Sequence, residues 1–227
     1  MTAHYDVLIT GNNLRLRDDF LGISTVCLIE APGFRALLDT GGPSSRFALI
    51  NALAGRGIGR EEIDLILLSH LHYDHCYNLD LFPKARIVVA QAELDYAAEP
   101  HPDDLVTPDW ILERLSRRRV EALTADTALA KGVEMFHAPG HTPGHHAVRL
   151  ETAVGPVVLA CDAIKYPKEV MTRRCDLAFD TVQRGSETIG RILDMAERIV
   201  PGHFPELYRE GEGWAWDGAA EFPLLIR

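Results

Sequence analysis

Short apolar runs, separated by glycine, proline and polar residues, dominate the first third of the chain. Two of them, Ser24–Glu30 and Arg35–Thr40, flank the sequence Ala31–Phe34, whose Pro-Gly pair is typical of a turn, so we expect a β-hairpin there. Asp64–Ser69 (DLILLS) is a continuous apolar run bounded by polar residues. It predicts a strand that is buried on both faces, as in a sheet covered by helices.

Three segments have the pattern of helices. Glycines and a proline at 41–43 end the second strand, and the serines that follow can cap a helix that runs to about Ala54. The segments Pro108–Arg118 and Ser186–Arg198 carry apolar residues on one face, which is typical of a helix packed on a sheet.

Further apolar runs predict more strands in the rest of the chain. They are Arg86–Gln91, Val133–Ala138, His146–Glu151, Val157–Cys161 and Ile199–Val200. Strands therefore alternate with helices in both halves, which indicates the α/β class, with two sheets in a sandwich and helices on the outside.

The composition fits a globular protein. The chain has 227 residues without a clear break in composition, so we expect one domain over residues 1–227. Apolar residues make up 47% and charged residues 25%, enough apolar residues for a core that needs no disulfides. The four cysteines show no paired short spacing, and neither a signal peptide nor an apolar stretch of ~20 residues is visible. We therefore expect a reduced, cytoplasmic setting and no membrane partner.

The charge of the chain bears on its partners. The formal net charge is −10 and the sequence pI is about 5.4. An acidic surface repels a phosphate backbone, which disfavours nucleic acid and favours a small-molecule substrate. Near the C-terminus, Gly213–Trp216 holds two indoles and Phe222–Ile226 is apolar; a homodimer contact or the wall of a pocket would account for either segment.

Six of the ten histidines lie in three loops that each follow a predicted strand. The three segments are His70–His75 (HLHYDH), Gly140–His145 (GHTPGH) and Pro201–His203 (PGH). Loops at strand ends are where a rigid scaffold holds catalytic groups.

The first segment predicts a metal site. It crowds four ionisable side chains, His70, His72, Asp74 and His75, into six residues, which is costly unless something binds them. Imidazole and carboxylate are the ligands that borderline divalent metals prefer. A lone His-x-His pair is weak evidence, since many lie on surfaces, but the full pattern after a buried strand is much stronger. One metal uses three or four protein ligands and the chain offers more, so we expect two metals, bridged by Asp162 at the end of an apolar strand.

These segments, in this order, resemble the motifs of the metallo-β-lactamase superfamily. Asp39, within LLDTG, matches the early aspartate of that family, and the resemblance runs from about Ser24 to His203. It implies the αββα sandwich of the family, two mixed β-sheets flanked by helices, with the metals at one edge between the sheets.

The resemblance also implies roles for individual residues. His70, His72 and His141 would hold the first metal, Asp74, His75 and His203 the second, and Asp162 would bridge the two. Asp39 would orient the loop or a ligand histidine without touching metal. Members with a glutamate at the second histidine position often bind a redox di-iron centre. His72 stands there in this chain, which favours zinc and hydrolysis, although such ligands also accept iron or manganese.

The expected reaction is hydrolysis of a small lactone or ester by a hydroxide that bridges the two metals. Asp74 can orient this hydroxide and then pass its proton to the leaving group. N-acyl homoserine lactonases, which the sequence resembles in this layout, use a tyrosine shortly after the bridging aspartate to polarise the carbonyl. Their tyrosine matches Lys165 here, and Tyr166 lies one position later. Tyr166 is thus a catalytic candidate, with packing of the loop as an equal alternative.

Three other activities stay open. A glyoxalase II-like thioesterase is disfavoured because only 24 residues follow His203, too few for the helical domain of that subfamily. A nuclease is suggested by a resemblance of 38–43 and 78–83 to the subfamily named for metallo-β-lactamase domain-containing protein 1, in which a human relative is assigned to RNA cleavage; the acidic balance argues against it. A mononuclear iron sulfur dioxygenase is disfavoured by the complete second ligand set.

Substrate choice is expected to depend on two loops, Pro100–Trp110 and Tyr166–Thr181. The second carries Arg173 and Arg174, which can meet a carboxylate product. An ordinary role as surface loops is at least as consistent with these sequences.

Overall fold

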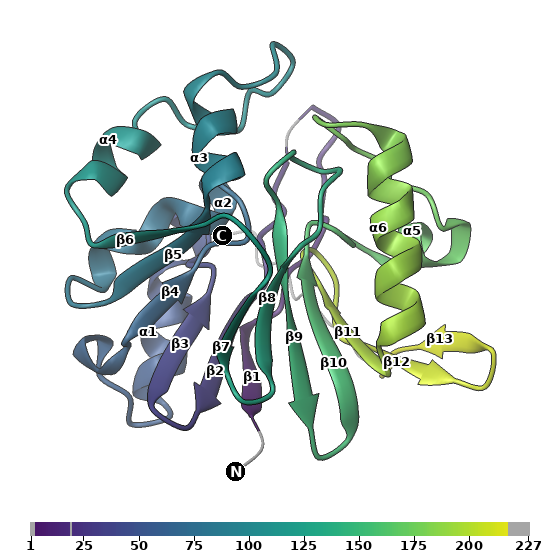
Figure 1. Ribbon diagram of the computed structural model, residues 1–227, viewed down its shortest axis with the longest axis horizontal. Coiled ribbons are helices and arrows are strands. Elements are labelled where there is room, and N and C mark those ends of the chain that lie inside the picture. Colours follow the sequence, from purple (N-terminus) through teal and green to yellow (C-terminus); the bar gives the residue numbers. More distant parts are fainter. Residues whose placement is uncertain (1–2, 19, 218–227) are drawn as a thin grey trace.

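The computed structural model describes residues 3–18 and 20–217. Two β-sheets pack face to face, and helices cover the outer side of each sheet (Figure 1). The sequence prediction of an α/β sandwich of two mixed sheets flanked by helices is confirmed.

The first sheet contains the N-terminal strands in the order of the chain. They are β1 (His4–Ile9), β2 (Val26–Ala31), β3 (Phe34–Leu38), β4 (Leu65–Leu67), β5 (Arg86–Ala90) and β6 (Val120–Leu123). Strands β1 to β3 are antiparallel, and β3 to β6 are parallel. The predicted hairpin is β2–β3, in which Ala31 pairs with Phe34.

The second sheet has the order β13-β12-β11-β10-β9-β8-β7. Its strands are β7 (Thr127–Ala130), β8 (Val133–His137), β9 (His146–Thr152), β10 (Gly155–Cys161), β11 (Arg198–Pro201), β12 (Leu207–Glu210) and β13 (Gly213–Ala215). Only the β10–β11 pair is parallel among these strands, because the helical segment between them carries the chain back across the sheet.

Helices α1 to α4 accompany the first sheet, and α5 and α6 the second (Figure 1). They are α1 (Arg46–Ala54), α2 (Tyr73–Cys76), α3 (Gln91–Ala98), α4 (Ile111–Ser116), α5 (Pro167–Thr172) and α6 (Val182–Met195), with 3-10 turns η1 (Pro43–Ser45), η2 (Arg60–Glu62) and η3 (Tyr77–Leu81).

The core has three layers. The middle layer lies between the two sheets, and the outer layers lie between each sheet and its helices. Strand β4 is apolar throughout because both of its faces are covered. Ile66 contributes to the layer beneath α1 and α4, whereas Leu65 and Leu67 face the second sheet. Successive side chains of a strand point to opposite faces, so in a strand covered on both sides every side chain is buried and apolar residues are favoured at each position.

The helix boundaries differ from the prediction in one instructive case. Helix α6 starts at Val182, four residues before the predicted start at Ser186, because the Thr181 side chain accepts the Arg184 N–H and caps it. It ends at Met195, and Arg198 opens β11 instead. Similarly, Gln91 begins α3 rather than ending β5.

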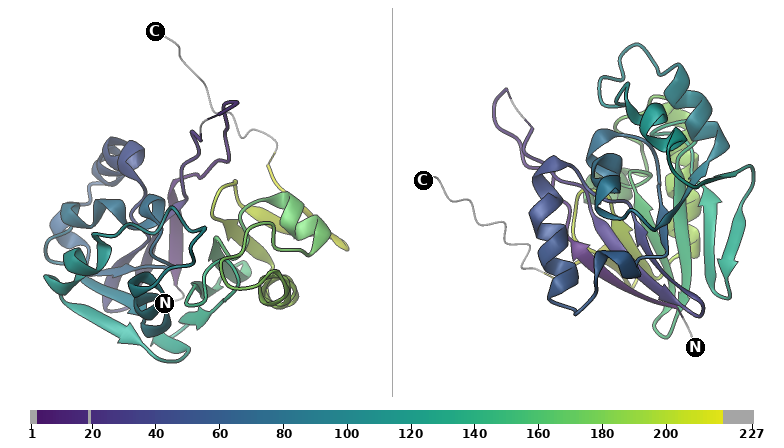
Figure 2. Two further views of the ribbon diagram at one scale, coloured as in Figure 1. Left: turned by 90° about the horizontal axis from the view of Figure 1, so that it is seen from above. Right: turned by 90° about the vertical axis from the view of Figure 1, so that its left-hand side faces the viewer.

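Residues 12–18 and 20–23 belong to an arm. Asn12 pairs with Ile23 and Arg15 with Phe20, so the chain doubles back in a narrow loop that projects from the sandwich (Figure 2). Within residues 3–18 and 20–217, no helix is both long enough and apolar enough to cross a membrane.

At the other end of the chain, Trp214 lies in β13 and packs against the layer beneath α6, with the Arg209 guanidinium 4.7 Å from its ring centroid. Phe222–Ile226 lies outside the described residues.

Candidate metal centre

Seven side chains singled out in the sequence meet at one edge of the sandwich. Four of them follow β4 of the first sheet, namely His70, His72, Asp74 and His75. The other three follow strands of the second sheet: His141 after β8, Asp162 after β10 and His203 after β11. Both sheets therefore contribute, and each side chain is held at the carboxyl end of a buried strand.

Three histidines form a first cluster. His70 Nε2 and His141 Nε2 each lie 3.0 Å from His72 Nδ1. In a tetrahedral zinc site with Zn–N distances of about 2.0–2.1 Å, two nitrogen ligands would lie roughly 3.3 Å apart. Both distances are thus close to the spacing that one metal ion requires, and the ligand atoms of all three histidines lie within 4.8 Å of one another.

A second cluster joins Asp74, His75 and His203. Asp74 Oδ2 lies 3.7 Å from His75 Nε2 and 3.6 Å from His203 Nε2. His75 is fully buried, and its Nε2 has no hydrogen-bond partner among the described residues. A buried nitrogen without a partner is costly, and a cation would satisfy it.

Asp162 lies between the two clusters. Its Oδ2 is 3.3 Å from His141 Nε2, whereas its Oδ1 is 3.3 Å from His75 Nε2 and 3.4 Å from His203 Nε2. Burial raises the pKa of this carboxyl group, but the surrounding histidines outweigh burial and hold the pKa well below its usual value. Asp162 is therefore an ionised carboxylate with one oxygen turned to each cluster.

Each of the five clustered histidines has one ring nitrogen that faces the clusters and an outward nitrogen that faces away from them. The outward nitrogen of every ring has a partner. His70 Nδ1 meets Ser69 Oγ (2.9 Å), His72 Nε2 meets Asp104 Oδ2 (3.2 Å), His75 Nδ1 meets Asp39 Oδ2 (2.7 Å), His141 Nδ1 meets the Leu177 carbonyl (3.2 Å) and His203 Nδ1 meets the Ile23 carbonyl (3.0 Å). Carboxylates and carbonyls only accept, so each ring they hold carries its proton on the outward nitrogen.

In a neutral ring the inward nitrogen is then a lone pair, and in the first cluster these lone pairs face one another. Lone pairs at 3.0 Å repel, and the contacts within the first cluster are not hydrogen bonds in this protonation state. Burial first, and then neighbouring histidines, lower the pKa of His70. Burial likewise lowers the pKa of His141 and outweighs the opposing effect of Asp162. Neutral, inward-facing imidazoles fit a divalent cation.

Asp39 lies behind His75, at the end of β3. It is fully buried, and besides His75 it accepts the Ser69 N–H (2.8 Å) and the Ser69 hydroxyl (2.7 Å). The hydroxyl proton is thereby committed to Asp39, so His70 Nδ1 donates to Ser69 Oγ. Asp39 adopts a φ of 62°, a left-handed conformation that is uncommon for a non-glycine residue and is stored strain of the kind found at functional sites.

Asp104 is a residue that the sequence analysis missed. It lies in the loop between α3 and α4, and besides His72 it accepts the Tyr96 hydroxyl (2.7 Å), the Thr107 hydroxyl (2.8 Å) and the Val106 N–H (2.9 Å). Burial raises its pKa, but His72 and these donors outweigh burial and lower it overall. Nothing in the sequence distinguishes Asp104 from its exposed neighbour Asp103.

Glu93 is a second residue that sequence reasoning missed, because helix α3 was not predicted. Its fully buried carboxylate accepts the Leu71 N–H (3.0 Å) and the Thr142 hydroxyl (2.7 Å). Leu71 lies between His70 and His72, and Thr142 follows His141. Glu93 therefore joins the metal loops of the two sheets. Burial raises the pKa of Glu93 despite these hydrogen bonds.

A pocket of about 270 Å³ opens onto the two clusters. Five of the clustered side chains line it, namely His72, Asp74, His141, Asp162 and His203. The rest of the lining includes Arg15, Phe20, Tyr73, Val106, Lys165, Tyr166 and Leu177. The two candidate substrate loops thus each contribute to it. Arg173 and Arg174 are exposed and lie outside the lining of this pocket.

Tyr166 lines this pocket, and its hydroxyl donates to Asp176 Oδ2 at 2.9 Å. Burial and this hydrogen bond raise the pKa of the phenol, so it stays protonated at neutral pH.

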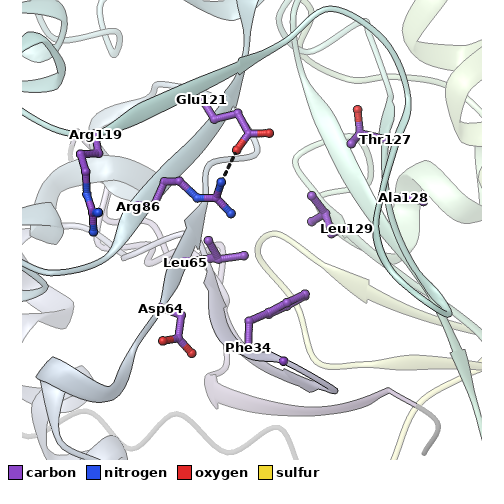
Figure 3. A pocket seen from close by; sticks show the side chains of 10 residues that line it. Phe34, Asp64, Leu65, Arg86, Arg119, Glu121, Thr127, Ala128 and Leu129 are labelled. Carbon is purple, nitrogen blue, oxygen red and sulfur yellow. Dashed lines mark hydrogen bonds and ion pairs between the residues drawn. The ribbon is translucent and has the colours of Figure 1, made fainter.

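A separate hollow lies at the opposite edge of the sheets, where β4, β5 and β6 begin (Figure 3). Its cations are already engaged: Arg86 forms an ion pair with Glu121 (2.7 Å), and Arg119 donates to the Lys84 carbonyl (3.0 Å). None of the seven clustered side chains lines it, so the histidine edge is the candidate site.

Comparisons with known proteins agree with this geometry. A family model described as the metallo-beta-lactamase superfamily matches residues 19–203. Metallo-beta-lactamase domain-containing protein 1 of Mus musculus is 34% identical over 187 residues, which are 80% of this chain and 64% of the mouse protein. An N-acyl homoserine lactonase of Bacillus sp. is 33% identical over 154 residues, 67% of this chain and 59% of that protein. The chain spans less than two thirds of the length of both relatives.

A solved structure shares the fold. AidC, a dizinc quorum-quenching lactonase in complex with a product, superposes with a TM-score of 0.67 and 20% sequence identity, covering 90% of this chain and 82% of AidC.

Proposed function

We propose that this chain, which belongs to the metallo-β-lactamase superfamily, is a metal-dependent hydrolase that acts on small lactones or esters with two metal ions, zinc in the first instance. The N-acyl homoserine lactonase of Bacillus sp., at 33% identity, supports the choice of lactones, and the dizinc AidC supports the choice of metal.

One observation carries this proposal: the two oxygens of the Asp162 carboxylate lie next to different ligand clusters. Each of its oxygens lies within 3.4 Å of a ligand nitrogen, and the oxygens face different clusters. A carboxylate shared in this way is suited to bridge two cations. We assign His70, His72 and His141 to the first metal, and Asp74, His75 and His203 to the second.

Bound at these residues, two divalent ions would lower the pKa of water toward neutrality, so that hydroxide is available as the nucleophile, and would polarise the carbonyl of the substrate. The chain supplies the rest. Asp74, which lines the pocket and is 15% exposed, orients the hydroxide and then passes its proton to the leaving alkoxide. Asp39 and Asp104 hold the rings of His75 and His72, so the ligands need no rearrangement during the reaction.

Tyr166 is the second proposed catalytic residue. Its protonated hydroxyl can donate to the carbonyl oxygen of a substrate if it exchanges Asp176 for that acceptor. The Tyr166→Phe variant is expected to lose roughly tenfold or more in kcat, about the effect of one lost hydrogen bond in a transition state, with an unchanged melting temperature. An unchanged kcat on the best substrate would remove Tyr166 from the catalytic set.

Metal content tests the centre. We expect two zinc ions per chain after loading and dialysis, and one in the His203→Ala variant. His4→Ala is the matched control, since His4 is an exposed histidine on β1 far along the chain from the ligands. A single iron per chain with oxygen consumption would point to a dioxygenase instead.

A substrate panel tests the reaction. The loaded enzyme is assayed on acyl homoserine lactones, simple lactones, aryl esters, thioesters, a β-lactam and single-stranded RNA. We expect turnover of lactones and esters that disappears in Asp162→Asn. Cleavage of RNA alone, or of thioesters alone, would overturn the choice of substrate.

A further inference from the structure

The projecting arm connects β1 to β2 (Figure 2), and its base is tied to the loop that carries His203. Thr25, the residue before β2, makes this connection. Its N–H donates to the Gly202 carbonyl (2.7 Å), and its hydroxyl donates to the Pro201 carbonyl (2.7 Å) and accepts the Gly11 N–H (3.1 Å). Thr25 is 5% exposed, so water competes little for these hydrogen bonds. Both ends of the arm are therefore joined to the two residues before His203.

His203 itself contacts the residues that close the arm. Asn12 and Ile23 pair as a β-bridge, with N···O distances of 2.9 Å and 3.2 Å in the two directions. His203 Nδ1 donates to the Ile23 carbonyl (3.0 Å) and lies 3.4 Å from the Asn12 carbonyl oxygen. The Phe20 ring of the arm stands edge-on to the His203 ring, with 6.1 Å between the centroids. One proposed metal ligand is thus in contact with the backbone and with an aromatic side chain of the arm.

The base of the arm reaches a second proposed ligand through Ser24. Ser24 is fully buried, and its hydroxyl donates to the backbone carbonyl of Asp74. Asp74 and His203 are two of the three side chains that we assign to the second metal. The outward nitrogens of the histidines in the first cluster have partners outside the arm. The base of the arm therefore supports the second cluster, whereas the first cluster has other supports.

Beyond its base, the arm makes few contacts with the rest of the protein. Among the described residues, the hydrogen bonds of 13–18 and 20–22 stay within the arm, as in the one from the Leu21 N–H to the Leu14 carbonyl (3.0 Å). Arg15 and Arg17 are exposed. A segment with few buried contacts opens locally at a low cost in free energy. The order of the arm therefore depends on its base and on the contacts with His203.

A bound ion would strengthen the contact between His203 and the arm. A cation at His203 Nε2 would withdraw electron density from the ring, which makes the Nδ1–H a stronger donor to the Ile23 carbonyl. Coupling of this kind is reciprocal. If the ordered arm favours binding of the ion, the ion favours the ordered arm by the same factor.

We propose that the arm and the second metal are coupled. Ser24 and Thr25 are positioning residues for the second ion, and binding of that ion orders the arm. Asn13, Arg15 and Phe20 of the arm line the pocket over the metal clusters, so the wall that a substrate meets is complete only when the second ion is bound. This inference rests on the proposed function, because it requires a centre of two metals.

Removal of the Thr25 hydroxyl tests the effect of the arm on the metal. Thr25→Val keeps the shape of the side chain but loses the hydrogen bonds to Pro201 and Gly11. We expect the affinity for the second zinc ion to fall about tenfold or more, and the affinity for the first ion to stay unchanged. Competition with a chromogenic chelator measures both affinities, and Co²⁺ absorption spectra assign each binding step to a cluster.

Two variants serve as controls for this measurement. Thr25→Ser keeps the hydroxyl and should bind the second ion as the wild type does. Thr152→Val removes a hydroxyl hydrogen bond at the turn between β9 and β10, away from the arm, and should leave both affinities unchanged.

Cleavage by trypsin tests the effect of the metal on the arm and needs no turnover of a substrate. Arg15 is an exposed cleavage site on the arm, and Lys131, in the turn between β7 and β8, is an exposed site for comparison. We expect cleavage after Arg15 to be about tenfold slower with two zinc ions than without metal, and cleavage after Lys131 to change little. Asp74→Ala removes a proposed ligand but keeps the carbonyl that Ser24 contacts. This variant should bind one ion, and its arm should be cleaved as rapidly as in the metal-free protein.

The possible results separate this inference from the proposed function. A wild-type protein that binds only one ion would overturn the two-metal function, and the coupling with it. Three results with two bound ions would overturn the coupling alone. They are an unchanged affinity for the second ion in Thr25→Val, an equal loss of affinity for both ions in that variant, and cleavage after Arg15 at the same rate with and without zinc.

Discussion

At the residue scale, the protein fixes its candidate metal ligands through the atoms behind them. Five imidazoles each have their outward nitrogen held, by a carboxylate, a hydroxyl or a carbonyl, so ring orientation and tautomer are set before any metal arrives. His72 is the one that presents Nδ1 inward, because Asp104 occupies its Nε2.

Replacement of Asp104 tests this arrangement. In Asp104→Asn the amide oxygen can still accept from His72, but the negative charge is lost and the amide NH2 takes the place of Oδ1, where it faces the backbone N–H groups of Val106 and Thr107. We expect zinc affinity to fall about 10- to 100-fold, measured by competition with a chromogenic chelator. Asp103→Asn, at an 89% exposed side chain one residue away, should leave the affinity unchanged. Equal affinities in both variants would show that Asp104 does not tune the metal.

The pKa shifts predict the order in which acid releases metal. Burial lowers the pKa of His75, but Asp74, Asp162 and Asp39 outweigh it and raise the pKa well above 6.5, and His203 is raised by its carboxylates in the same way. Protons therefore compete with metal at these two residues at a higher pH than at His70 and His141, whose pKa values are lowered. As the pH falls, the second cluster should lose its ion first.

Metal content after equilibration across a pH series, with Co²⁺ absorption spectra to identify the emptied cluster, provides the measurement. Simultaneous release of both ions, or earlier loss from the three-histidine cluster, would contradict the expected order.

The seven side chains of the candidate metal centre could be predicted from the sequence, because histidine and aspartate residues follow apolar strands directly. Asp104 and Glu93 also hold the metal loops in place, but Asp104 lies in a polar loop and Glu93 on a helix that was not predicted. A single carboxylate in such a context looks like any surface acid, and only the fold shows that it is buried against a ligand loop.

At the scale of elements, helix α6 supports the loop that carries His141. Thr188 of α6 donates its hydroxyl hydrogen to the Pro139 carbonyl (2.7 Å). Gly185 faces Gly140 across this contact: a Cβ added at Gly140 would lie 2.1 Å from Gly185 Cα, so both glycines allow the close approach of the two backbones.

Two glycines of α6 should respond in opposite ways to alanine. A Cβ at Gly185 would lie 2.7 Å from both Cβ and Sγ of buried Cys175, so Gly185→Ala should cost about 1–3 kcal/mol through overpacking. Gly190 has nothing within 4 Å of an added Cβ, and Gly190→Ala should gain about 0.5–1 kcal/mol because alanine is the better helix former. Urea unfolding of the metal-loaded protein measures both. The same sign for the two variants would refute this account of the packing.

The elements that the sequence predicted are those with a single strong pattern. Strands β4, β5 and β10 are continuous apolar runs, and α6 has one apolar face. Strands β1 and β12 and helix α3 escaped prediction because they are only partly buried and mix polar with apolar residues. In such segments the tertiary partner decides the structure, and local pattern does not.

At the scale of the whole molecule, the two sheets meet in the candidate metal centre as well as in the core layer between them. Four side chains of the centre come from the first sheet and three from the second, and Glu93 adds a hydrogen-bonded link between their loops. Bound metal should therefore stabilise the packing of one sheet on the other.

Removal of metal tests this coupling. A ligand that binds only the folded state at 100 times its Kd adds about 2.7 kcal/mol, and a domain of this size shifts by roughly 2–4 °C per kcal/mol. Treatment with EDTA should thus lower the melting temperature by about 5–10 °C, and added zinc should restore it. The His203→Ala variant, with one cluster incomplete, should show a smaller drop. If EDTA left the melting temperature of a zinc-loaded sample unchanged, the centre would not stabilise the packing of the two sheets.

The order of the ligands along the chain has a consequence for biosynthesis. Chains fold from the N-terminus as they leave the ribosome, and the first sheet, with its four ligands at 70–75, is complete by Leu123. His141 and Asp162 emerge later, and His203 emerges only after β11 has been made. A nascent chain can thus present the three-histidine cluster before the second cluster exists. Loading of the full centre must follow translation of β11, so a ribosome-bound intermediate stopped before His203 would carry at most one ion in a complete cluster.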